Sequence, residues 1–342
     1  MKYKNKYYKR ICYVGTIYTL FVYLLYSTIE DIRNTLFIFA YGIPDEIMNR
    51  FPHHIDLNEK KWNDYITRKT YGEKRKWILG LIVKAKLPRI GTTDKLFAQD
   101  HLTFSSQIIG NNNYIFIEDS QLICSKLEAN ANSPFNKQYL TEKWYYPITQ
   151  LLYGKTKYKW FAKNNQCKEL LVTKIDTVEY LKGKKQILIN FSEEWGKASK
   201  EKKDFILNVY DLKYNDVELL NTKKIILFTQ PLDLGENYQI KIYRKIISKY
   251  EQNNLVIKVH PRDTIDYEKY FPESFVYRKR VPSQLLDLLG IRFERAVTLF
   301  SSAVDEFTYP ISIDWYGTEF DERLKDKWGI ITCPPNANKC SV

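Results

Sequence analysis

The 342-residue sequence contains few of the residues that build metal and disulfide sites. It has four histidines and five cysteines, and no C-x-x-C pair occurs. The cysteines are odd in number and widely spaced, at Cys12, Cys124, Cys167, Cys333 and Cys340. This pattern indicates neither a disulfide framework nor a zinc site. We therefore expect no metal, and a reducing, cytoplasmic compartment as the location.

Several motifs of common enzymes are absent as well. There is no D-x-D pair, the acidic motif through which many sugar transferases hold a metal-bound diphosphate. There is no G-x-G-x-x-G loop for a dinucleotide and no G-x-S-x-G turn for a nucleophilic serine. These absences argue against dinucleotide-dependent enzymes and against serine hydrolases of that kind.

Positive charge exceeds negative charge along the whole chain. The 53 lysines and arginines against 40 acids give a formal net charge of +13, and the chain also has 27 tyrosines. This composition suits a nucleic-acid-binding protein, but the basic residues are dispersed and form no compact arm. It suits equally an enzyme with anionic substrates, or one that works against an anionic membrane surface.

The longest uncharged run follows a group of basic residues near the N-terminus. Residues 11–29, ICYVGTIYTLFVYLLYSTI, are nearly long enough to span a membrane. Glycine, threonine, serine and tyrosine make the run less apolar, and it divides naturally into a strand, a turn and a helix. We expect that arrangement, with a membrane anchor as the alternative.

Short apolar runs alternate with helical stretches through most of the sequence, which is typical of parallel sheets covered by helices. In the first half we expect strands at 11–16, 35–41, 77–83 and 114–118. In the second half we expect the strands KKIILFTQP, NLVIKVHP and RAVTLFSSA, separated by the helices YQIKIYRKIISKYEQ and SQLLDLLG. The predicted fold class is α/β with doubly wound sheets.

The chain length favours two domains. We expect an N-terminal Rossmann-like domain over residues 1–178, a charged helical connector over 179–222 and a C-terminal Rossmann-like domain over 223–342. In open α/β sheets, ligands bind beyond the carboxyl ends of the strands. The polar clusters that follow the predicted strands are therefore the candidate site residues.

The clearest cluster is His260-Pro261-Arg262, at the end of NLVIKVHP. Proline fixes φ and ends strand pairing, so His260 takes a defined direction at the edge of the sheet. Arg262 supplies bidentate donors, and the hydroxyls of Ser301 and Ser302 follow a later strand, where we expect a helix N-terminus. Together these groups predict a phosphate site; a capped loop histidine is the alternative.

Acidic residues follow two other predicted strands. Glu118 and Asp119 end the run YIFIED, and Asp233 follows KKIILFTQP. We expect Glu118 and Asp119 on the acceptor side, where they orient or deprotonate a hydroxyl, with a solvated turn as the alternative. Asp233 is predicted to be either a helix N-cap or a catalytic base.

A phosphate site without a metal motif indicates a nucleotide-dependent transferase that needs no metal. The motifs resemble those of bacterial sialyltransferases, most closely glycosyltransferase family 52, the lipooligosaccharide sialyltransferases, and more distantly the bacterial polysialyltransferases. The resemblance covers roughly residues 10–310. The shared motifs, in order, are the acidic pair Glu118-Asp119, His260-Pro261-Arg262 and Ser301-Ser302.

The resemblance implies a GT-B architecture, two Rossmann-like domains facing across a cleft, with CMP-sialic acid held mainly by the C-terminal domain. It implies that His260 contacts the donor phosphate and assists the departure of CMP. Because the departing phosphate gains negative charge, we expect the imidazole of His260 to be cationic. The resemblance also implies that Ser301 and Ser302 bind the same phosphate. The general base of family 52 falls near Asp233, whereas related bacterial families use the first acid of the acidic pair, here Glu118.

Two positions depart from the family pattern. Ser120 follows the acidic pair where glycine is usual, which puts the tight backbone approach of that loop in doubt. Ser283 stands where members often carry a glutamate that holds the ribose of the nucleotide. We expect Ser283 on the nucleotide side, and the donor is less firmly assigned than the fold.

The resulting hypothesis is a metal-independent, inverting sialyltransferase that needs no cofactor. It moves sialic acid from CMP-sialic acid to a terminal galactose of bacterial lipooligosaccharide or capsule. The rivals are a GT-B transferase with another nucleotide sugar and a basic nucleic-acid-binding protein. The expected partners are the donor and the glycan acceptor, with no nucleic acid. Peripheral association with the inner face of the cell membrane and a homodimer are left open.

Overall fold

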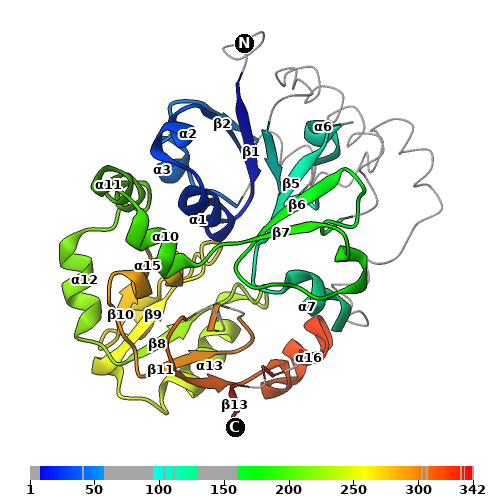
Figure 1. The fold of residues 1–342 in the computed structure, drawn as a ribbon. Coiled ribbons are helices and arrows are strands. Elements are labelled where there is room, and N and C mark those ends of the chain that lie inside the picture. The colour runs from blue at the N-terminus through cyan, green and yellow to red at the C-terminus, as the bar shows by residue number, and fades with distance from the viewer. Residues whose placement is uncertain are drawn as a thin grey trace, which may run out of the picture. The chain divides into compact units, whose positions relative to one another are not determined.

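The structure is a computed structural model that describes residues 8–40, 42–57, 95–102, 105–110, 112–129, 160–301, 303–304, 307–331, 333–334 and 336–340. The described residues form two compact units, one that extends to Ile206 and one that begins at Leu207. Each unit contains one β-sheet and the helices that accompany it (Figure 1). The predicted strand 77–83 lies outside the described residues.

The first unit begins with the strand, turn and helix that the sequence predicts. Strand β1 spans Arg10–Val14 and helix α1 spans Ile17–Tyr26. Thr16 caps α1, because its hydroxyl accepts a hydrogen bond from the Thr19 amide at 3.1 Å. Helix α1 has ten residues. Among the described residues, no helix has both the length and the apolar character needed to span a membrane.

The remaining elements of the first unit alternate between helices and short strands. They are α2 (Ile29–Arg33), β2 (Thr35–Phe39), α3 (Asp45–Met48), β3 (His54–Asp56), β4 (Lys95–Ala98), α6 (Ser105–Ile109), β5 (Tyr114–Ile117), α7 (Ile123–Ala129), β6 (Cys167–Val172), β7 (Lys185–Leu188), α10 (Phe191–Lys197) and α11 (Lys200–Val209). The strands pair in parallel in the order β3-β2-β1-β4-β5-β6-β7. The strands predicted at 11–16, 35–41 and 114–118 correspond to β1, β2 and β5.

Strand β7 lies inside the segment 179–222, which the sequence pattern predicts to be a helical connector. It pairs with β6 as the last strand of the first sheet, and the chain stays in the first unit through Ile206. The strand is short, lies among charged residues and has one paired neighbour, so it needs little apolar sequence. The same lack of a long apolar run explains why the pattern does not predict β4 and β6. Helices α10, α11 and α12 (Tyr214–Asn221) do occupy most of the expected connector.

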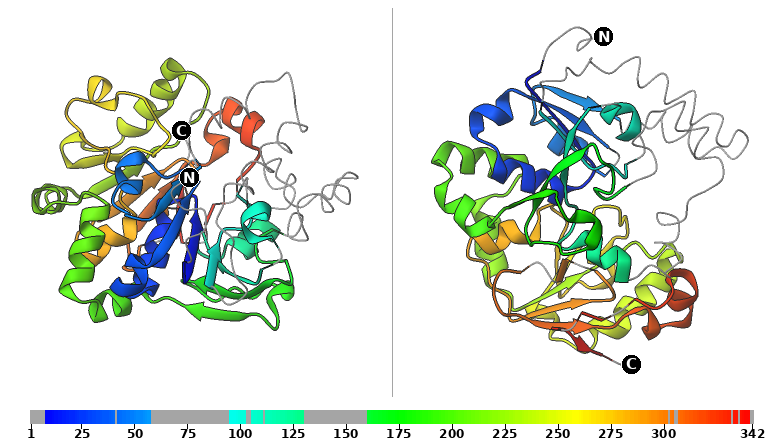
Figure 2. Two further views of the ribbon diagram at one scale, coloured as in Figure 1. Left: turned by 90° about the horizontal axis from the view of Figure 1, so that it is seen from above. Right: turned by 45° about the vertical axis from the view of Figure 1, so that its right-hand side comes forward.

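The second unit contains β8 (Ile225–Phe228), α13 (Glu236–Ile247), β9 (Leu255–Lys258), α14 (Tyr267–Tyr270), β10 (Phe275–Tyr277), α15 (Ser283–Leu288), β11 (Arg295–Thr298), β12 (Ser312–Trp315), α16 (Glu322–Trp328) and β13 (Asn338–Lys339). Strands β8, β9 and β11 and helices α13 and α15 correspond to the elements that the sequence predicts. The strands pair in parallel in the order β10-β9-β8-β11-β12-β13. Figure 2 shows the strands and helices of this unit in yellow-green to red.

Both sheets have the same reversal of strand order. Counted from its own first strand, the second sheet has the order 3-2-1-4-5-6, and the described strands of the first sheet have this order with a seventh strand added. This is the order of dinucleotide-binding folds, in which the ligand lies where the order reverses. The switch point lies between β1 and β4 in the first sheet and between β8 and β11 in the second. The doubly wound α/β class is therefore confirmed.

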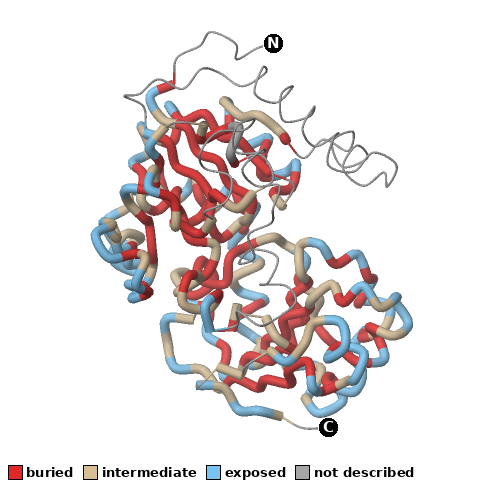
Figure 3. Tube along the Cα trace, turned by 90° about the vertical axis from the view of Figure 1, so that its right-hand side faces the viewer, coloured by how far each residue is buried: buried red, intermediate tan, exposed pale blue. Residues whose placement is uncertain are grey.

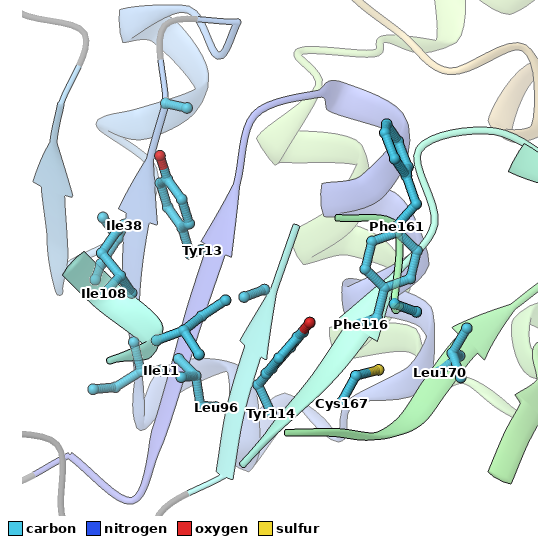
Figure 4. Packing of buried hydrophobic residues seen from close by; sticks show 14 of the residues in the cluster. Ile11, Tyr13, Ile38, Leu96, Ile108, Tyr114, Phe116, Phe161, Cys167 and Leu170 are labelled. Carbon is cyan, nitrogen blue, oxygen red and sulfur yellow. The ribbon is translucent and has the colours of Figure 1, made fainter. Parts of the chain in front are cut away.

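The strands form the core of each unit. Most strand residues are buried, which is the pattern of parallel sheets covered on both faces (Figure 3). In the first unit, Ile11, Tyr13, Leu96, Tyr114 and Phe116 from neighbouring strands belong to one apolar cluster (Figure 4). In the second unit, α13 contributes Ile240, Tyr243 and Ile246 to a cluster that includes residues of β8 and β9.

We predict that Gly42→Ala destabilises the first unit. A Cβ at Gly42 would lie 2.0 Å from the carbonyl oxygen of Gly15, a backbone atom that cannot move without shifting the end of β1. Such overpacking typically costs about 1–3 kcal/mol in the free energy of unfolding. Chemical denaturation of the purified protein measures this change.

The matched control is Gly196→Ala in α10, where no atom lies within 4 Å of the added Cβ. Alanine is favoured over glycine inside a helix by about 0.5–1 kcal/mol, so this variant should be no less stable than the parent. Equal denaturation midpoints for the two variants would contradict the predicted contact.

Candidate active site

The second unit gathers the predicted phosphate-binding residues at one edge of its sheet. His260 follows β9, Gln230 follows β8 and Ser301 follows β11. Strand β8 lies between the other two. Neighbouring strands are about 4.8 Å apart, so the ends of β9 and β11 are separated by about 10 Å. His260 and Ser301 therefore lie on either side of the loop that leaves β8, at the switch point where a ligand of such a sheet binds.

The His260 side chain is held in one orientation and one tautomer. Its backbone amide donates to the Thr229 hydroxyl at 3.0 Å, and its Nδ1 accepts from the Arg262 amide at 3.1 Å. Because Nδ1 is an acceptor, a neutral ring carries its proton on Nε2. Burial lowers the pKa of His260 to about 4, with further contributions from the charges of Arg262 and Lys258.

The low pKa corrects the expectation of a cationic imidazole. In the protein without ligand the ring is neutral at pH 7, because a buried ring beside two positive groups binds a proton weakly. A neutral ring with Nε2–H is still a hydrogen-bond donor. The two cationic neighbours, Lys258 and Arg262, make the surroundings favourable to an anion.

Pro261 and Arg262 complete the turn after β9. The Pro261 carbonyl accepts a hydrogen bond from Arg280 Nη2 at 3.3 Å, and the Asp263 amide donates to the His260 carbonyl at 2.8 Å. Arg262 is exposed at this turn. The turn is therefore held by a backbone hydrogen bond and by Arg280, while the guanidinium of Arg262 is accessible.

Ser301 begins a tight turn after β11. Its amide donates to the Thr298 hydroxyl at 2.9 Å, and its own hydroxyl accepts from the Ala303 amide at 3.4 Å. Ser302 lies outside the described residues. Ala303 and Val304 are in a 3₁₀ turn. Residues 305 and 306 also lie outside the described residues, so the helix N-terminus predicted here stays a prediction.

Ser283 is the first residue of α15, which follows β10 at the same edge of the sheet. It is only 5% exposed. Ser283 therefore lies at the same edge of the sheet as His260, and burial leaves little of its hydroxyl accessible.

Asp233 lies in the loop after β8 and has 73% of its side chain exposed. Its φ is +50°, a left-handed conformation that aspartate tolerates better than most residues. The N-cap of α13 is Gly235, so the N-cap alternative for Asp233 is wrong. Lys327 Nζ donates to the carbonyls of Leu232 and Asp233 at 2.8 and 3.0 Å. The carboxylate is thus accessible while its backbone is held.

Glu118 follows β5 in the first unit and is 1% exposed. Its Oε1 accepts from the Tyr18 hydroxyl at 2.7 Å, from the Thr173 amide at 2.8 Å and from the Thr173 hydroxyl. Burial raises the pKa of Glu118 to about 7, although the hydrogen bonds from Thr173 and Tyr18 oppose the rise. The carboxyl group links α1 to the end of β6, and it has a pKa suited to proton transfer but little access to solvent.

Asp119 faces a histidine that the sequence pattern does not reveal. His101 Nε2 lies 3.2 Å from Asp119 Oδ2, and the ring stacks on Phe161 with 4.5 Å between centroids. Burial lowers the pKa of His101, but the charge of Asp119 and the hydrogen bond to it outweigh burial, and the net shift is upward. His101 follows β4, a strand of only four residues, so no long apolar run marks its position.

The departure at Ser120 has a simple structural consequence. Among the described residues, the non-glycine positions with positive φ are Leu122, Phe161, Ala162, Asp211 and Asp233. Ser120 is described and is not one of them, so its conformation does not require glycine. The loop after Glu118 therefore accommodates the serine without backbone strain.

The comparisons with known proteins show the family of the chain. The sequence model of glycosyltransferase family 52 matches residues 135–322, which is more than half of the chain. The chain is also 30% identical over 317 residues to an uncharacterized protein of Haemophilus influenzae, a match that covers 91% of this chain and 95% of that protein.

Two solved structures show a similar fold. One is an alpha/beta-galactoside alpha-2,3-sialyltransferase of Photobacterium phosphoreum, with a TM-score of 0.53, 12% identity and coverage of 94% of this chain and 95% of that chain. The other is a 2,6-sialyltransferase of Photobacterium sp. JT-ISH-224 in complex with CMP and lactose, with a TM-score of 0.53, 11% identity and coverage of 93% and 75%. At this identity the likeness concerns the fold, and it supports the GT-B type.

The resemblance that the acidic pair, the His-Pro-Arg turn and the serines indicate is thus confirmed: the chain belongs to glycosyltransferase family 52.

Proposed function

We propose that the protein is a metal-independent, inverting sialyltransferase with CMP-sialic acid as donor and a terminal galactose as acceptor. The acceptor we favour is lipooligosaccharide, with capsule second. The observation that carries the proposal is the placement of His260 and Ser301 on either side of the β8 loop, at the switch point of the second sheet. That edge, in a chain of family 52, suits the phosphate of a nucleotide sugar.

On the donor side, the neutral His260 acts as a hydrogen-bond donor. Its Nε2–H is available because Nδ1 accepts from the Arg262 amide. As the bond between C2 of sialic acid and the phosphate oxygen breaks, CMP gains negative charge, and donors placed where this charge develops lower the barrier. The anion in turn raises the proton affinity of the ring, since an opposite charge nearby favours the imidazolium form.

On the acceptor side, we propose Asp233 as the general base. The acceptor hydroxyl attacks C2 of sialic acid from the face opposite to CMP, its proton passes to the carboxylate and the anomeric configuration inverts. Asp233 is exposed, so an acceptor hydroxyl can approach it. Glu118 is the rival base, but its Oε1 already accepts three hydrogen bonds within the first unit.

The proposed setting is the inner face of the cell membrane. The net charge of +13 supports attraction to anionic lipid and to anionic substrates. A surface glycan that is assembled on a lipid carrier would be presented to the enzyme there.

The first test is His260→Ala. We expect kcat for CMP release from CMP-sialic acid, with lactose as acceptor, to fall on the order of 10²–10⁴-fold, as for loss of one acid–base or charge-stabilising group. The matched control is His54→Ala, which removes a half-buried histidine of β3 in the first unit and should leave kcat within about threefold. A His260→Ala enzyme as active as its control would contradict the role.

The second test concerns the donor. The parent enzyme, assayed with CMP-sialic acid and with UDP- and GDP-sugars, should release CMP. Release of UDP or GDP without CMP would replace the proposed donor by another nucleotide sugar. Salt-sensitive binding to DNA or RNA, with no transfer from any nucleotide sugar, would favour the nucleic-acid-binding alternative.

The third test separates the two candidate bases. We expect Asp233→Asn to lower kcat on the order of 10²–10⁴-fold and Glu118→Gln to lower it much less. If Glu118 were the base, kcat/KM would fall below about pH 7, where its carboxyl binds a proton, and Glu118→Gln would abolish that acid limb together with transfer. A pH profile of both variants therefore decides between Asp233 and Glu118.

A further inference from the structure

One buried amide connects the two loops that carry the proposed catalytic residues of the second unit. Gln239 lies in the first half of α13 and is 4% exposed. Its Oε1 accepts from the Leu232 amide at 2.9 Å. Its Nε2 lies 3.0 Å from the Gln230 carbonyl and 2.9 Å from both Asp263 Oδ2 and the Tyr267 hydroxyl. Each hydrogen-bonding atom of the amide is thus engaged.

On one side, these contacts hold the loop after β8. The Leu232 amide and the Gln230 carbonyl flank Pro231, and Asp233 follows directly. The Gln230 amide donates to the Tyr243 hydroxyl at 2.7 Å, one turn further along the same helix. The route by which the chain reaches Asp233 is therefore set by side chains of α13.

On the other side, the contacts hold the turn after β9. Asp263 Oδ1 accepts from the Ile265 amide at 3.2 Å, and the Tyr267 hydroxyl donates to Oδ2 at 2.8 Å. The Asp263 amide in turn donates to the His260 carbonyl at 2.8 Å. Asp263 is only 9% exposed, so the hydrogen bonds of its carboxylate with Gln239 and Tyr267 take the place of hydrogen bonds to water. Movement of Asp263 would therefore move the His260 turn.

We propose that Gln239 is a positioning residue that fixes His260 and Asp233 relative to each other through one amide. The inference rests on the proposed roles of these two residues. Leucine at position 239 would fill a similar volume, but it would leave the Leu232 amide without its acceptor and remove the hydrogen bond from position 239 to Asp263. Glutamate would keep the acceptor for Leu232 and place a second carboxylate beside Asp263, where like charges repel. Displacements of about 1 Å in a catalytic group can cost on the order of 100-fold in rate.

The sharpest experiment exchanges the two partners. In Gln239→Glu, measured as the full-length enzyme with CMP-sialic acid and lactose, we expect kcat to fall about 10–100-fold with a smaller change in the donor KM. In the double variant Gln239→Glu/Asp263→Asn, the amide and the carboxylate have changed places. The hydrogen bond between positions 239 and 263 then forms again with the donor on the other side, while the Gln230 carbonyl still lacks its donor. We expect kcat to recover part of the loss and to exceed that of Gln239→Glu at least about threefold.

The matched control is Gln186→Leu. Gln186 in β7 of the first unit also holds a loop with both ends of its amide: Oε1 accepts from the Asp176 amide at 2.9 Å and Nε2 donates to the Asp176 carbonyl at 2.7 Å. We expect a comparable loss of thermal stability and no change in kcat. If the Gln239 variants lower only the stability, as this control does, or if the double variant is no better than Gln239→Glu, Gln239 has a purely structural role and the proposal is overturned.

A second readout does not depend on activity. The charges of Lys258 and Arg262 act on the ring of His260, and Arg280 binds the Pro261 carbonyl in the same turn. NMR titration of the four histidines, with the His260 signal assigned from its loss in His260→Ala, gives its pKa in the parent and in Gln239→Leu. Loosening the turn should admit water and raise that pKa from about 4 toward the ordinary value.

The two readouts separate the inference from the proposed function. If the parent does not release CMP from CMP-sialic acid, the proposed function fails, and the His260 titration alone decides the role of Gln239. An unchanged pKa of His260 in folded Gln239→Leu overturns the positioning role, whatever the donor is.

Discussion

The hydrogen bond from the Phe300 amide to Gln230 Oε1, at 3.0 Å, joins the two loops that leave the second sheet where its strand order reverses. At a switch point the loops after the two central strands diverge to opposite faces, so amides there have no partner in the strand ladder. A buried amide without a partner costs about 1–3 kcal/mol. The Gln230 side chain meets this requirement and fixes the separation of the loops that carry Asp233 and Ser301.

In the first sheet, a glutamine side chain also accepts a hydrogen bond from a backbone amide at the switch point. The Gly15 amide donates to Gln99 Oε1 at 2.7 Å, across the switch point between β1 and β4. Both glutamines occur in the sequence Leu-Phe-x-Gln, at 96–99 and 227–230. Since the two switch points share this bond while their other polar residues differ, the topology explains the glutamines. The chemistry must be sought in the residues that differ: the His260 turn in one sheet and the acidic pair in the other.

The sequence predicts the parts of the fold that have long apolar runs, and it fails where they are short. Strands β1, β2, β8, β9 and β11 follow from their β-branched and aromatic residues, and their order places His260 and Ser301 at one edge. Strands β4 and β7 have the same four-residue length as β8, β9 and β11. However, β4 contains no β-branched residue and β7 only one, so neither leaves a clear strand pattern in the sequence. The charge on His260 depends on the burial of its ring and on the nearby charge of Lys258. Both arise only when the chain folds, so the sequence does not reveal them.

The protonation states of His260 and Glu118 help to decide which carboxylate serves as the general base. Around His260, burial and the positive groups disfavour another positive charge, so the pKa of the ring is low. The same positive groups favour the binding of an anion. Around Glu118, burial disfavours a negative charge, so the pKa of its carboxyl rises to about 7. Glu118 is buried and accepts hydrogen bonds from Tyr18 and Thr173. It must break those bonds before it can take a proton from an acceptor hydroxyl. Asp233 is exposed, and its Oδ2 lies 3.7 Å from Lys327 Nζ, so an acceptor hydroxyl can approach it without breaking several buried hydrogen bonds. Lys327 holds the Asp233 carbonyl, and Gln239 holds the amide of the neighbouring Leu232. We therefore propose that the chemistry lies in the loops that Gln239 joins, and that the hydrogen bonds of Glu118 mainly stabilise the first unit.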